Sequence, residues 1–555
     1  MLLIKLLRVA RLVTILFLSL AAFSQGTGTP VDKTEAEKWR EDLRFMADEM
    51  PLRHKNLFHS ITREQFEFAV GVLGERIPTM SREQIIVQMA RIVAMVGDGH
   101  TNIAPTRDPK IGFHSLPVKL YFFKNGLYVR AADEEHADIV GARVLYISGV
   151  PVDAAYQSVR NIIGRDNEMD AKYFAAQLLA IPEILYGLNL SSDPEKATFV
   201  VQAGRQQKIV RLAPAGPAEL IPPDTDTTWM PRSGWVDARD TARSPTPLWL
   251  KDPLNKYWFE YLKDSKTVYV QLNQVGNKDD ETLEAFCKRL FAFVDSNPAE
   301  RFVLDLRLNR GGNGALNRPL LLGIIRSKVD QRGKLFTIVG RSTWSAAQFL
   351  VNDLERFTNT IFVGEPTGGK INSYGDSRKI TLPNSGITVR VSSLWWQQDE
   401  RDARQWTAPD IAANLTFDAY RNNIDPAMKA ILNYVPKKPL ADILSDALAA
   451  GNGRPVSEQF LSWKYDPANE YQDAEPILNT LGYKLLANKR VGDAITIFRL
   501  NAEEHPQSAN VFDSLADAYL ADNDRERAIQ NYEKAIALDP KMESAIEALK
   551  KLRGQ

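Results

Sequence analysis

The sequence predicts a multidomain α/β protein, on three observations. The chain has 555 residues, and at about 150 residues per domain this length suggests three or four domains. From about residue 256 onward, strand-like segments alternate with helical ones, which is typical of an α/β core built from β-α-β crossovers. Residues 466–553 instead carry a purely helical repeat.

The composition excludes several classes of protein. Apolar residues make up 44% and charged residues 25%, which is ordinary for a globular chain and argues against long disorder. The 69 Lys and Arg balance the 69 Asp and Glu, and this neutrality argues against a nucleic-acid partner. The single cysteine, Cys287, excludes an internal disulfide framework and a Cys-built zinc site. Its helical context predicts a core residue.

Residues 1–24 are typical of a secretory signal peptide. Lys5, Arg8 and Arg11 precede an apolar run over residues 12–23, which ends in small residues. A run of this length is too short to span a bilayer comfortably. We therefore expect export to the periplasm or the extracellular space. The alternative is a permanent anchor, so any membrane attachment would come only from an uncleaved signal.

Residues 31–105 are predicted to form an N-terminal helical segment. Two capping boxes, Thr62 with Gln65 and Ser81 with Gln84, precede apolar stripes of helical spacing. The segment ends in the motif DGHT at 98–101, which contains His100. His54 and His59 are five residues apart without a third ligand in the sequence, so we expect surface residues rather than a metal site.

Residues 115–212 predict a small α/β segment. Lys124-Asn125-Gly126 lies between alternating residues and signals a hairpin. The stretch resembles a PDZ domain, whose exposed sheet edge captures a peptide as an added strand. A generic α/β module is the alternative. Residues 213–250, rich in Pro, Thr, Asp and Arg, predict a linker or an extended flap.

Residues 251–435 predict the α/β core. Strands are expected at 267–272, 301–306, 335–339 and 361–363, with helices at 280–294 and after Ser345. Active sites in such cores form at the carboxyl ends of the strands. The segments 309–313, 340–345 and 364–370 each follow one of these strands.

The C-terminal repeat has a period of 34 residues. Ala494, Phe498 and Pro506 recur as Ala528, Tyr532 and Pro540. This period and pattern predict tetratricopeptide repeats at 466–553, after a linker at 436–465. Such repeats present a concave groove to peptides or partner proteins. Two copies fall short of the usual three, so we expect the unit to pack on the preceding domain or on a partner. A plain pair of helical hairpins is the alternative.

Ser345 is the candidate nucleophile of the core. It lies where a strand turns into a helix, so its hydroxyl would be exposed and the Ala346 amide could help to hold an oxyanion. The Gly311-Gly312 turn ends the neighbouring strand and could supply the second donor. The alternative is an ordinary N-cap serine.

Six segments in this order resemble the tail-specific, or C-terminal processing, serine protease family, including its tricorn-core branch. The resemblance covers roughly residues 35–430, and the segments are DGHT at 98–101, VLDLRLNRGGN at 303–313, GRSTWSAAQ at 340–348, VGEPTGGK at 363–370, LPNSG at 382–386 and APDI at 408–411. It implies a crotonase/ClpP-like α/β protease core with Ser345 as nucleophile. It also implies an oxyanion site at Gly311, Gly312 and Ala346.

The resemblance leaves the general base open between two residues. One branch uses a lysine 25 residues after the serine, where this chain has Lys370. A lysine base must be neutral, which requires desolvation. The tricorn branch uses a histidine where this chain has His100, and an imidazole needs no large pKa shift. That branch's supporting glutamate has no counterpart just before Pro409, where Gln405 stands. A turn histidine and a solvated loop lysine are the structural alternatives.

Together these observations predict an exported serine endopeptidase acting on polypeptide through an acyl-enzyme, without metal or organic cofactor. Arg341, Trp395 and Trp396 are predicted substrate contacts, although plain packing also explains the two tryptophans. One alternative is a non-catalytic peptide- or ligand-binding protein on the same fold. Another is a scaffold that works through its tetratricopeptide repeats.

Overall fold

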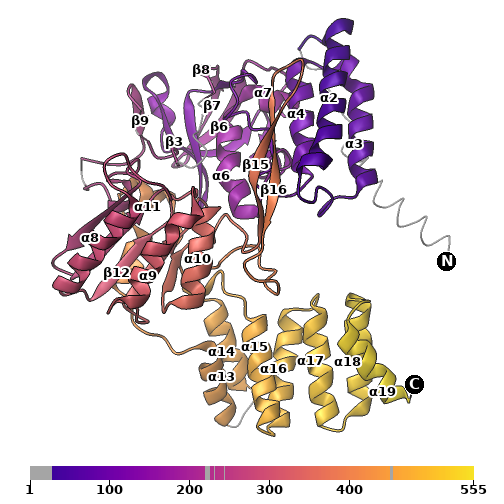
Figure 1. Cartoon of the computed structure of the whole chain (residues 1–555), viewed down its shortest axis with the longest axis vertical. Coiled ribbons are helices and arrows are strands. Elements are labelled where there is room, and N and C mark those ends of the chain that lie inside the picture. Colours follow the sequence, from indigo (N-terminus) through magenta and orange to yellow (C-terminus); the bar gives the residue numbers. More distant parts are fainter. Residues whose placement is uncertain (1–27, 219–225, 231, 243, 451–453, 555) are drawn as a thin grey trace. The chain divides into compact units, whose positions relative to one another are not determined.

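The computed structural model describes residues 28–218, 226–230, 232–242, 244–450 and 454–554. The predicted signal at 1–24 lies outside these residues. The chain divides into two compact units: Met1–Ala408 with Ala413–Asn433, and Pro409–Ala412 with Tyr434–Gln555 (Figure 1). Among the described helices, none combines the length and apolar character needed to cross a membrane.

The described part of the first unit begins with three helices, α2 (Lys33–Arg53), α3 (Arg63–Arg76) and α4 (Arg82–Ala94). Both predicted capping boxes are present, at the start of α3 and of α4. In each box, the N-cap hydroxyl accepts the amide N–H of the glutamine, and the glutamine side-chain oxygen accepts the amide N–H of the N-cap residue. This pair of hydrogen bonds fixes the start of the helix. A long hairpin of β15 (Ser373–Thr381) and β16 (Thr388–Trp396) runs beside α2 (Figure 1). The hairpin contributes Ile380, Val389 and Val391 to the hydrophobic cluster that also contains the buried residues of α2, α3 and α4.

A seven-stranded sheet follows, with the predicted hairpin between its first two strands. The order β2-β3-β4-β6-β7 is wholly antiparallel, and β5 and β9 pair with β4 and β3. Three helices follow or interrupt the strands, and a two-stranded ladder of β1 and β8 lies apart. The bounds are β1 (His114–Ser115), β2 (Val118–Phe123), β3 (Gly126–Asp133), β4 (Arg143–Ile147), β5 (Val150–Pro151), α5 (Val152–Arg160), α6 (Glu168–Leu178), α7 (Pro182–Gly187), β6 (Ala197–Ala203), β7 (Gln206–Leu212), β8 (Gly216–Pro217) and β9 (Trp235–Asp237).

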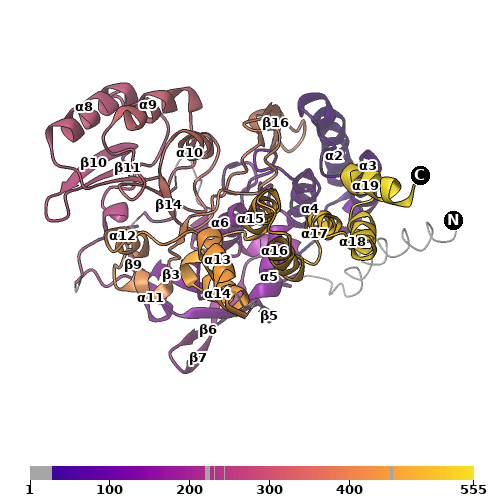
Figure 2. The same cartoon turned by 90° about the horizontal axis from the view of Figure 1, so that it is seen from below.

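The α/β core contains five strands in sequence order, β10 to β14. The first pair is antiparallel and the others are parallel, with one helix in each crossover. Figure 2 shows α8 and α9 over one face of this sheet. The bounds are β10 (Tyr257–Leu262), β11 (Thr267–Leu272), α8 (Leu283–Ser296), β12 (Arg301–Asp305), α9 (Arg318–Arg326), β13 (Leu335–Val339), α10 (Ala346–Phe357), β14 (Ile361–Gly364), α11 (Phe417–Arg421) and α12 (Pro426–Leu432).

The parallel strands of the core sheet are buried on both faces, as such strands require, whereas β10 is mostly half-buried. Every residue of β11 and β13 is buried, and β12 exposes only its first residue partly. The predicted strands are therefore confirmed to within one residue. The ends of β12, β13 and β14 meet at one edge, which brings the three segments that follow these strands together. The likeness to a PDZ domain and to the crotonase/ClpP superhelix stays a prediction.

The second unit is a stack of helical pairs. Its elements are β17 (Ile411–Ala412), α13 (Leu440–Ala449), α14 (Arg454–Lys464), α15 (Glu475–Ala487), α16 (Val491–Glu504), α17 (Ala509–Ala521), α18 (Arg525–Leu538) and α19 (Glu543–Arg553). The repeat residues Ala494, Phe498, Ala528 and Tyr532 are buried in one cluster. Gly482 allows close packing, because a Cβ there would lie 2.4 Å from the Phe498 ring.

The prediction that residues 436–465 form a linker is wrong. The described residues of this stretch form the pair α13 and α14, whose Leu440, Leu444, Val456 and Phe460 are buried with the repeat residues. This pair supplies the third member that two isolated repeats lack. The described residues of 213–250, predicted as a linker or an extended flap, include β8, β9 and the buried Trp229 and Trp249.

Candidate active site

Ser345 occupies a strained turn between β13 and α10. Its backbone has φ 54° and ψ −125°, which are the angles of the first central residue of a type II′ turn, normally a glycine. It lies at the N-cap position of α10, but its hydroxyl makes no capping hydrogen bond. The alternative of an ordinary capping serine is therefore not what the structure shows. Strain of this kind gathers at functional sites.

Backbone amides lie beside Ser345. The Gly311 amide is taken, because it donates to Asn309 Oδ1 at 2.9 Å. Gly312 pairs with Val275 in an isolated parallel β-bridge. The two hydrogen bonds of this bridge involve its neighbours, because Val275 N–H donates to Gly311 O and Asn313 N–H donates to Val275 O. The N–H of Gly312 itself therefore points away from Val275. A Cβ on Gly311 would lie 2.8 Å from Ser345 Cβ and 2.9 Å from the Ala346 nitrogen. The Gly312 and Ala346 amides, which have no acceptor in the described part of the chain, remain as donors for an oxyanion.

His100 lies against the residue before the serine. Asp98 Oδ1 accepts the amides of His100 at 3.1 Å and Thr101 at 2.8 Å, which shapes the DGHT turn. The imidazole stacks on the Trp344 indole with ring centroids 3.9 Å apart. Burial lowers the pKa of His100 to about 4, so the ring is neutral near pH 7. Its Nδ1 is buried and finds no hydrogen-bond partner among the described residues.

The loop that leads from β14 to Lys370 contacts the same turn through its backbone. The amides of Gly368 and Gly369 donate to Thr343 O at 3.0 and 3.2 Å, which ties their loop to the segment two residues before Ser345. Glycine is required there, since a Cβ on Gly368 would lie 2.2 Å from Arg341 O. Lys370 is half-buried, and the structure shows no hydrogen bond or ion pair for its amine in the described residues. The His100 ring and the backbone of the loop that carries Lys370 therefore both contact residues of the nucleophile turn.

Sequence reasoning missed Asp166, which is buried just before α6. Its carboxylate accepts the Gly99 amide and the Trp344 indole N–H. Burial, with the nearby Asp170 charge, raises the pKa of Asp166 to about 7, although Lys370 acts in the opposite direction. No motif marks this residue, because its role depends on contacts across more than sixty positions of the chain.

Of the predicted substrate contacts, Trp396 lies at the site. Its ring packs on Phe349 of α10, with centroids 5.6 Å apart, and it is 39% exposed. A Cβ on Gly375 would lie 3.1 Å from Trp396 Cδ1 and 3.8 Å from His100 Cε1. Trp395 packs on Tyr374 instead.

Arg341 is engaged by protein groups. Its Nε and Nη2 donate to Glu365 at 2.9 and 2.8 Å, and Nη1 donates to Phe122 O at 2.8 Å. The guanidinium also lies over the Tyr121 ring. The predicted substrate contact is still a prediction, but the bonds present tie the loop before Ser345 to β2.

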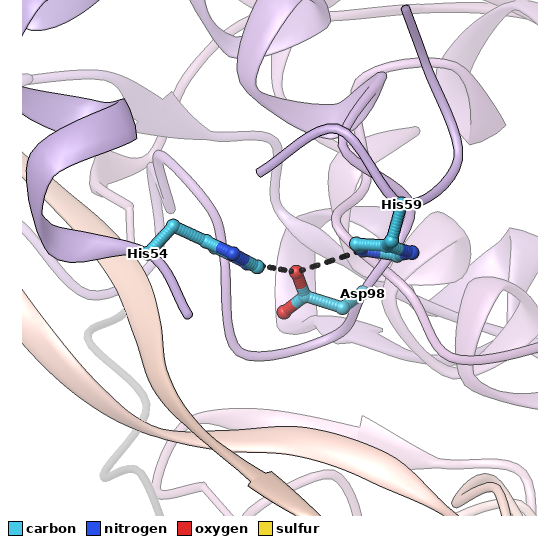
Figure 3. Close-up of side chains that lie close together, drawn as sticks. All are labelled: His54, His59 and Asp98. Carbon is cyan, nitrogen blue, oxygen red and sulfur yellow. Dashed lines mark hydrogen bonds and ion pairs between the residues drawn. The ribbon is translucent and has the colours of Figure 1, made fainter. Parts of the chain in front are cut away.

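His54 and His59 are not the surface pair that the sequence predicts. His54 is buried, and Asp98 lies between the two rings as a third neighbour (Figure 3). His54 Nε2 lies 2.9 Å from Asp98 Oδ2, and His59 Nε2 lies 3.8 Å from the same atom. The Asn56 amide donates to His54 Nδ1 at 3.0 Å. A neutral His54 must therefore carry its proton on Nε2, where a metal would need the lone pair.

The group of His54, His59 and Asp98 therefore fits a hydrogen-bonded support better than a metal centre. Asp98 accepts from His54 and Ser392 as well as from two amides of the DGHT turn. Hydrogen bonds to the charged form hold the pKa of Asp98 well below its usual range. The support fixes the loop that carries His100.

The lone thiol takes no part in this site. Cys287 is buried in α8, as predicted, and burial raises its pKa to about 12. A protonated thiol in the core is a poor nucleophile.

Comparison with known proteins gives structural likenesses only. No protein-family model matches the chain, and no curated protein sequence matches it. The structure of mature CPAF complexed with lactacystin is 12% identical, with 72% of this chain and 99% of that chain covered and a TM-score of 0.48. The photosystem II D1 C-terminal processing protease is 13% identical, with coverage of 72% and 97% and a TM-score of 0.30.

The C-terminal helices give a separate likeness. The first tetratricopeptide domain of Spaghetti (RPAP3), bound to an HSP90 peptide, is 16% identical and covers 21% of this chain and 88% of its own, with a TM-score of 0.16. The likenesses to mature CPAF and to the D1 C-terminal processing protease each cover 72% of the chain. At these identities and TM-scores the likenesses carry no argument about the activity, so the function is inferred from the site itself.

Proposed function

We propose that this chain is a serine endopeptidase that hydrolyses polypeptide through an acyl-enzyme. The observation that carries the proposal is the strained turn at Ser345, with the free amides of Gly312 and Ala346 beside it. In this mechanism Ser345 Oγ attacks the scissile carbonyl and its proton passes to a neighbouring base. The two amides hold the oxyanion of the tetrahedral intermediate, and the base gives the proton to the leaving amine as the C–N bond breaks. Water then releases the acyl group.

Lys370 is the base that we propose first. The imidazole of His100, with its pKa lowered to about 4, is a weak acceptor for a serine proton. An imidazolium there would also be buried without a carboxylate on Nδ1. Lys370 is held next to the turn by backbone bonds of the two glycines before it. His100 would then support the turn through its stack on Trp344.

Hydrolysis of a peptide library by single variants tests this proposal. We expect Ser345→Ala and Lys370→Ala to lose turnover and His100→Ala to keep part of it. Lys379→Ala, an exposed lysine on β15, and His136→Ala, bound to Asp133, are the matched controls and should retain full activity. If His100→Ala loses turnover while Lys370→Ala keeps it, the two roles are exchanged. If Ser345→Ala keeps turnover, Ser345 is not the nucleophile and the proposed mechanism is wrong. If the wild type itself shows no turnover, the non-catalytic binding protein on this fold remains.

We also propose that the protein is exported and that its repeat unit recruits a peptide or protein partner. The first 24 residues and the 34-residue period support these two proposals. Sequencing the mature N-terminus after cell fractionation tests export. Because α13 and α14 belong to the second unit, the truncation that tests recruitment should end at Asn433 rather than near residue 465. A scaffold loses partner binding in that truncation, while peptide hydrolysis should survive.

A further inference from the structure

The start of α6 contacts every loop of the candidate site. Asp166 Oδ1 accepts the Gly99 amide at 2.9 Å, and Oδ2 accepts Trp344 Nε1 at 2.8 Å. One carboxylate therefore joins the loop of His100 to the loop of Ser345. The fit around it is close, since a Cβ on Gly99 would lie 3.0 Å from the Trp344 ring.

The next residues bind the two remaining loops. Asn167 Oδ1 caps α6 by accepting the amides of Met169 and Asp170, while its Nδ2 donates to Thr367 O at 3.1 Å. Thr367 begins the Thr-Gly-Gly turn before Lys370. Asp170 Oδ1 accepts Arg310 Nη2 at 3.4 Å, and Arg310 directly precedes the Gly311-Gly312 turn. These side chains are all buried.

We propose that Asp166 is the positioning residue of the site and acts through Trp344. The inference rests on the proposed hydrolysis and adds a residue that no motif marks. Trp344 precedes Ser345 in the chain, and its ring is the surface on which His100 stacks. The bond to Nε1 fixes the rotation of this indole, so the position of the nucleophile and that of the imidazole are set by one carboxylate.

A carboxylate is needed at this position for a geometric reason. Both oxygens of Asp166 accept an N–H, whereas an asparagine side chain offers one acceptor and would turn its own donors toward the second N–H. A buried carboxylate is costly to fold, because desolvation opposes its charge. A buried charge lowers the free energy of unfolding, and this one is hydrogen-bonded to two loops of the site. Such a residue is a candidate for a functional role rather than for packing alone.

Kinetics of Asp166→Asn, Trp344→Phe and the double variant test the proposal. The substrate is the library peptide that the wild type cleaves fastest, and acylation is followed separately with a fluorophosphonate probe. We expect kcat and the acylation rate to fall by about tenfold to hundredfold in each single variant, with KM nearly unchanged. Because both changes remove the same bond, the double variant should be no slower than the slower single variant.

Glu168→Gln is the matched control. Glu168 lies two residues away in the first turn of α6, and its side-chain hydrogen bonds within the described residues go to Tyr156 and Arg160 rather than to the site loops. Its activity should equal that of the wild type. The indole N–H resonance that Trp344→Phe removes identifies Trp344 by NMR, and it should shift in Asp166→Asn. This readout reports the bond without relying on turnover.

The outcomes separate the two proposals. A wild-type protein that the probe does not label contradicts the proposed function. A labelled wild type whose Asp166→Asn variant reacts at the same rate contradicts only the positioning role. Multiplicative losses in the double variant, or an unmoved Trp344 resonance in Asp166→Asn, also overturn it, because Asp166 would then act independently of the indole.

Discussion

The imidazole of His100 lies flat on the indole of Trp344, with centroids 3.9 Å apart and planes 21° apart. This stack joins two motifs that are 244 positions apart in the sequence. It also buries the imidazole, and desolvation then lowers the pKa of His100. In this structure the DGHT histidine is therefore a neutral ring beside the nucleophile turn.

Strain at Ser345 predicts an unusual order of stabilities. Glycine tolerates φ 54° with ψ −125°, whereas alanine retains the strain and loses the hydroxyl. We expect Ser345→Gly to be more stable than Ser345→Ala by about 1 kcal/mol, after the greater freedom of glycine in the unfolded chain is included. Urea unfolding of both variants measures the difference. Equal stabilities would show that the turn is relaxed.

Gly312 tests the oxyanion site. Its φ is 127°, and a Cβ there would lie 2.2 Å from Val275 O. Gly312→Ala should therefore displace the turn, lower stability by about 2 kcal/mol and abolish acylation by a fluorophosphonate probe.

Gly314→Ala is its control, because a Cβ at Gly314 meets only ordinary contacts at 3.7 Å or more. This variant should fold and react as the wild type does. If Gly312→Ala reacts at the wild-type rate, the turn does not bind the oxyanion.

The dependence of stability on pH reports the ionisation of Asp166. Its pKa is raised to about 7 in the folded protein, so the folded state binds the proton more tightly than the unfolded state does. Its contribution to stability is present below about pH 4 and is lost as the pH rises through 7. The melting temperature should therefore fall more steeply between pH 5 and 7.5 in the wild type than in Asp166→Asn. His100 contributes with the opposite sign, but it is common to both proteins. Parallel curves would contradict a raised pKa.

Substitution of Arg341 distinguishes a structural role of this residue from a contact with the substrate. Its bidentate pair with Glu365 is largely buried, and removing one member leaves the other charge without a partner. Arg341→Ala should lower stability by about 3 kcal/mol and leave KM unchanged at a temperature where the variant is folded. A tenfold rise in KM with unchanged stability would instead support the substrate contact that the sequence predicts.

Local patterns predicted much of the fold. The capping boxes at Thr62 and Ser81 and the strands of the core appear where short-range rules place them. The failure at 436–465 has a physical cause: α13 and α14 lack the repeat signature, and only their packing on the repeats identifies them as a third pair. Residue spacing within 436–465 does not predict that these helices pack on the repeat helices.

The same limit applies to the candidate site. Ser345, Gly312 and Ala346 lie in local motifs that adjoin one strand edge, so the sequence could bring them together. Asp166 could not be found in this way, because its partners Gly99 and Trp344 come from separate loops. His54 likewise meets Asp98 only through the fold. Each missed residue is a buried polar group whose partners are distant in sequence.

Covalent labelling of Ser345 tests the central claim most directly. The full chain is treated with a fluorophosphonate probe, digested and analysed by mass spectrometry, with Ser345→Ala and Ser342→Ala treated in parallel. Ser342 is a buried serine in the same loop that donates to Asp226. We predict probe on the peptide that contains Ser345 in the wild type and in Ser342→Ala, and none in Ser345→Ala. An unlabelled wild type, or equal labelling of Ser345→Ala, would contradict a serine nucleophile at this turn.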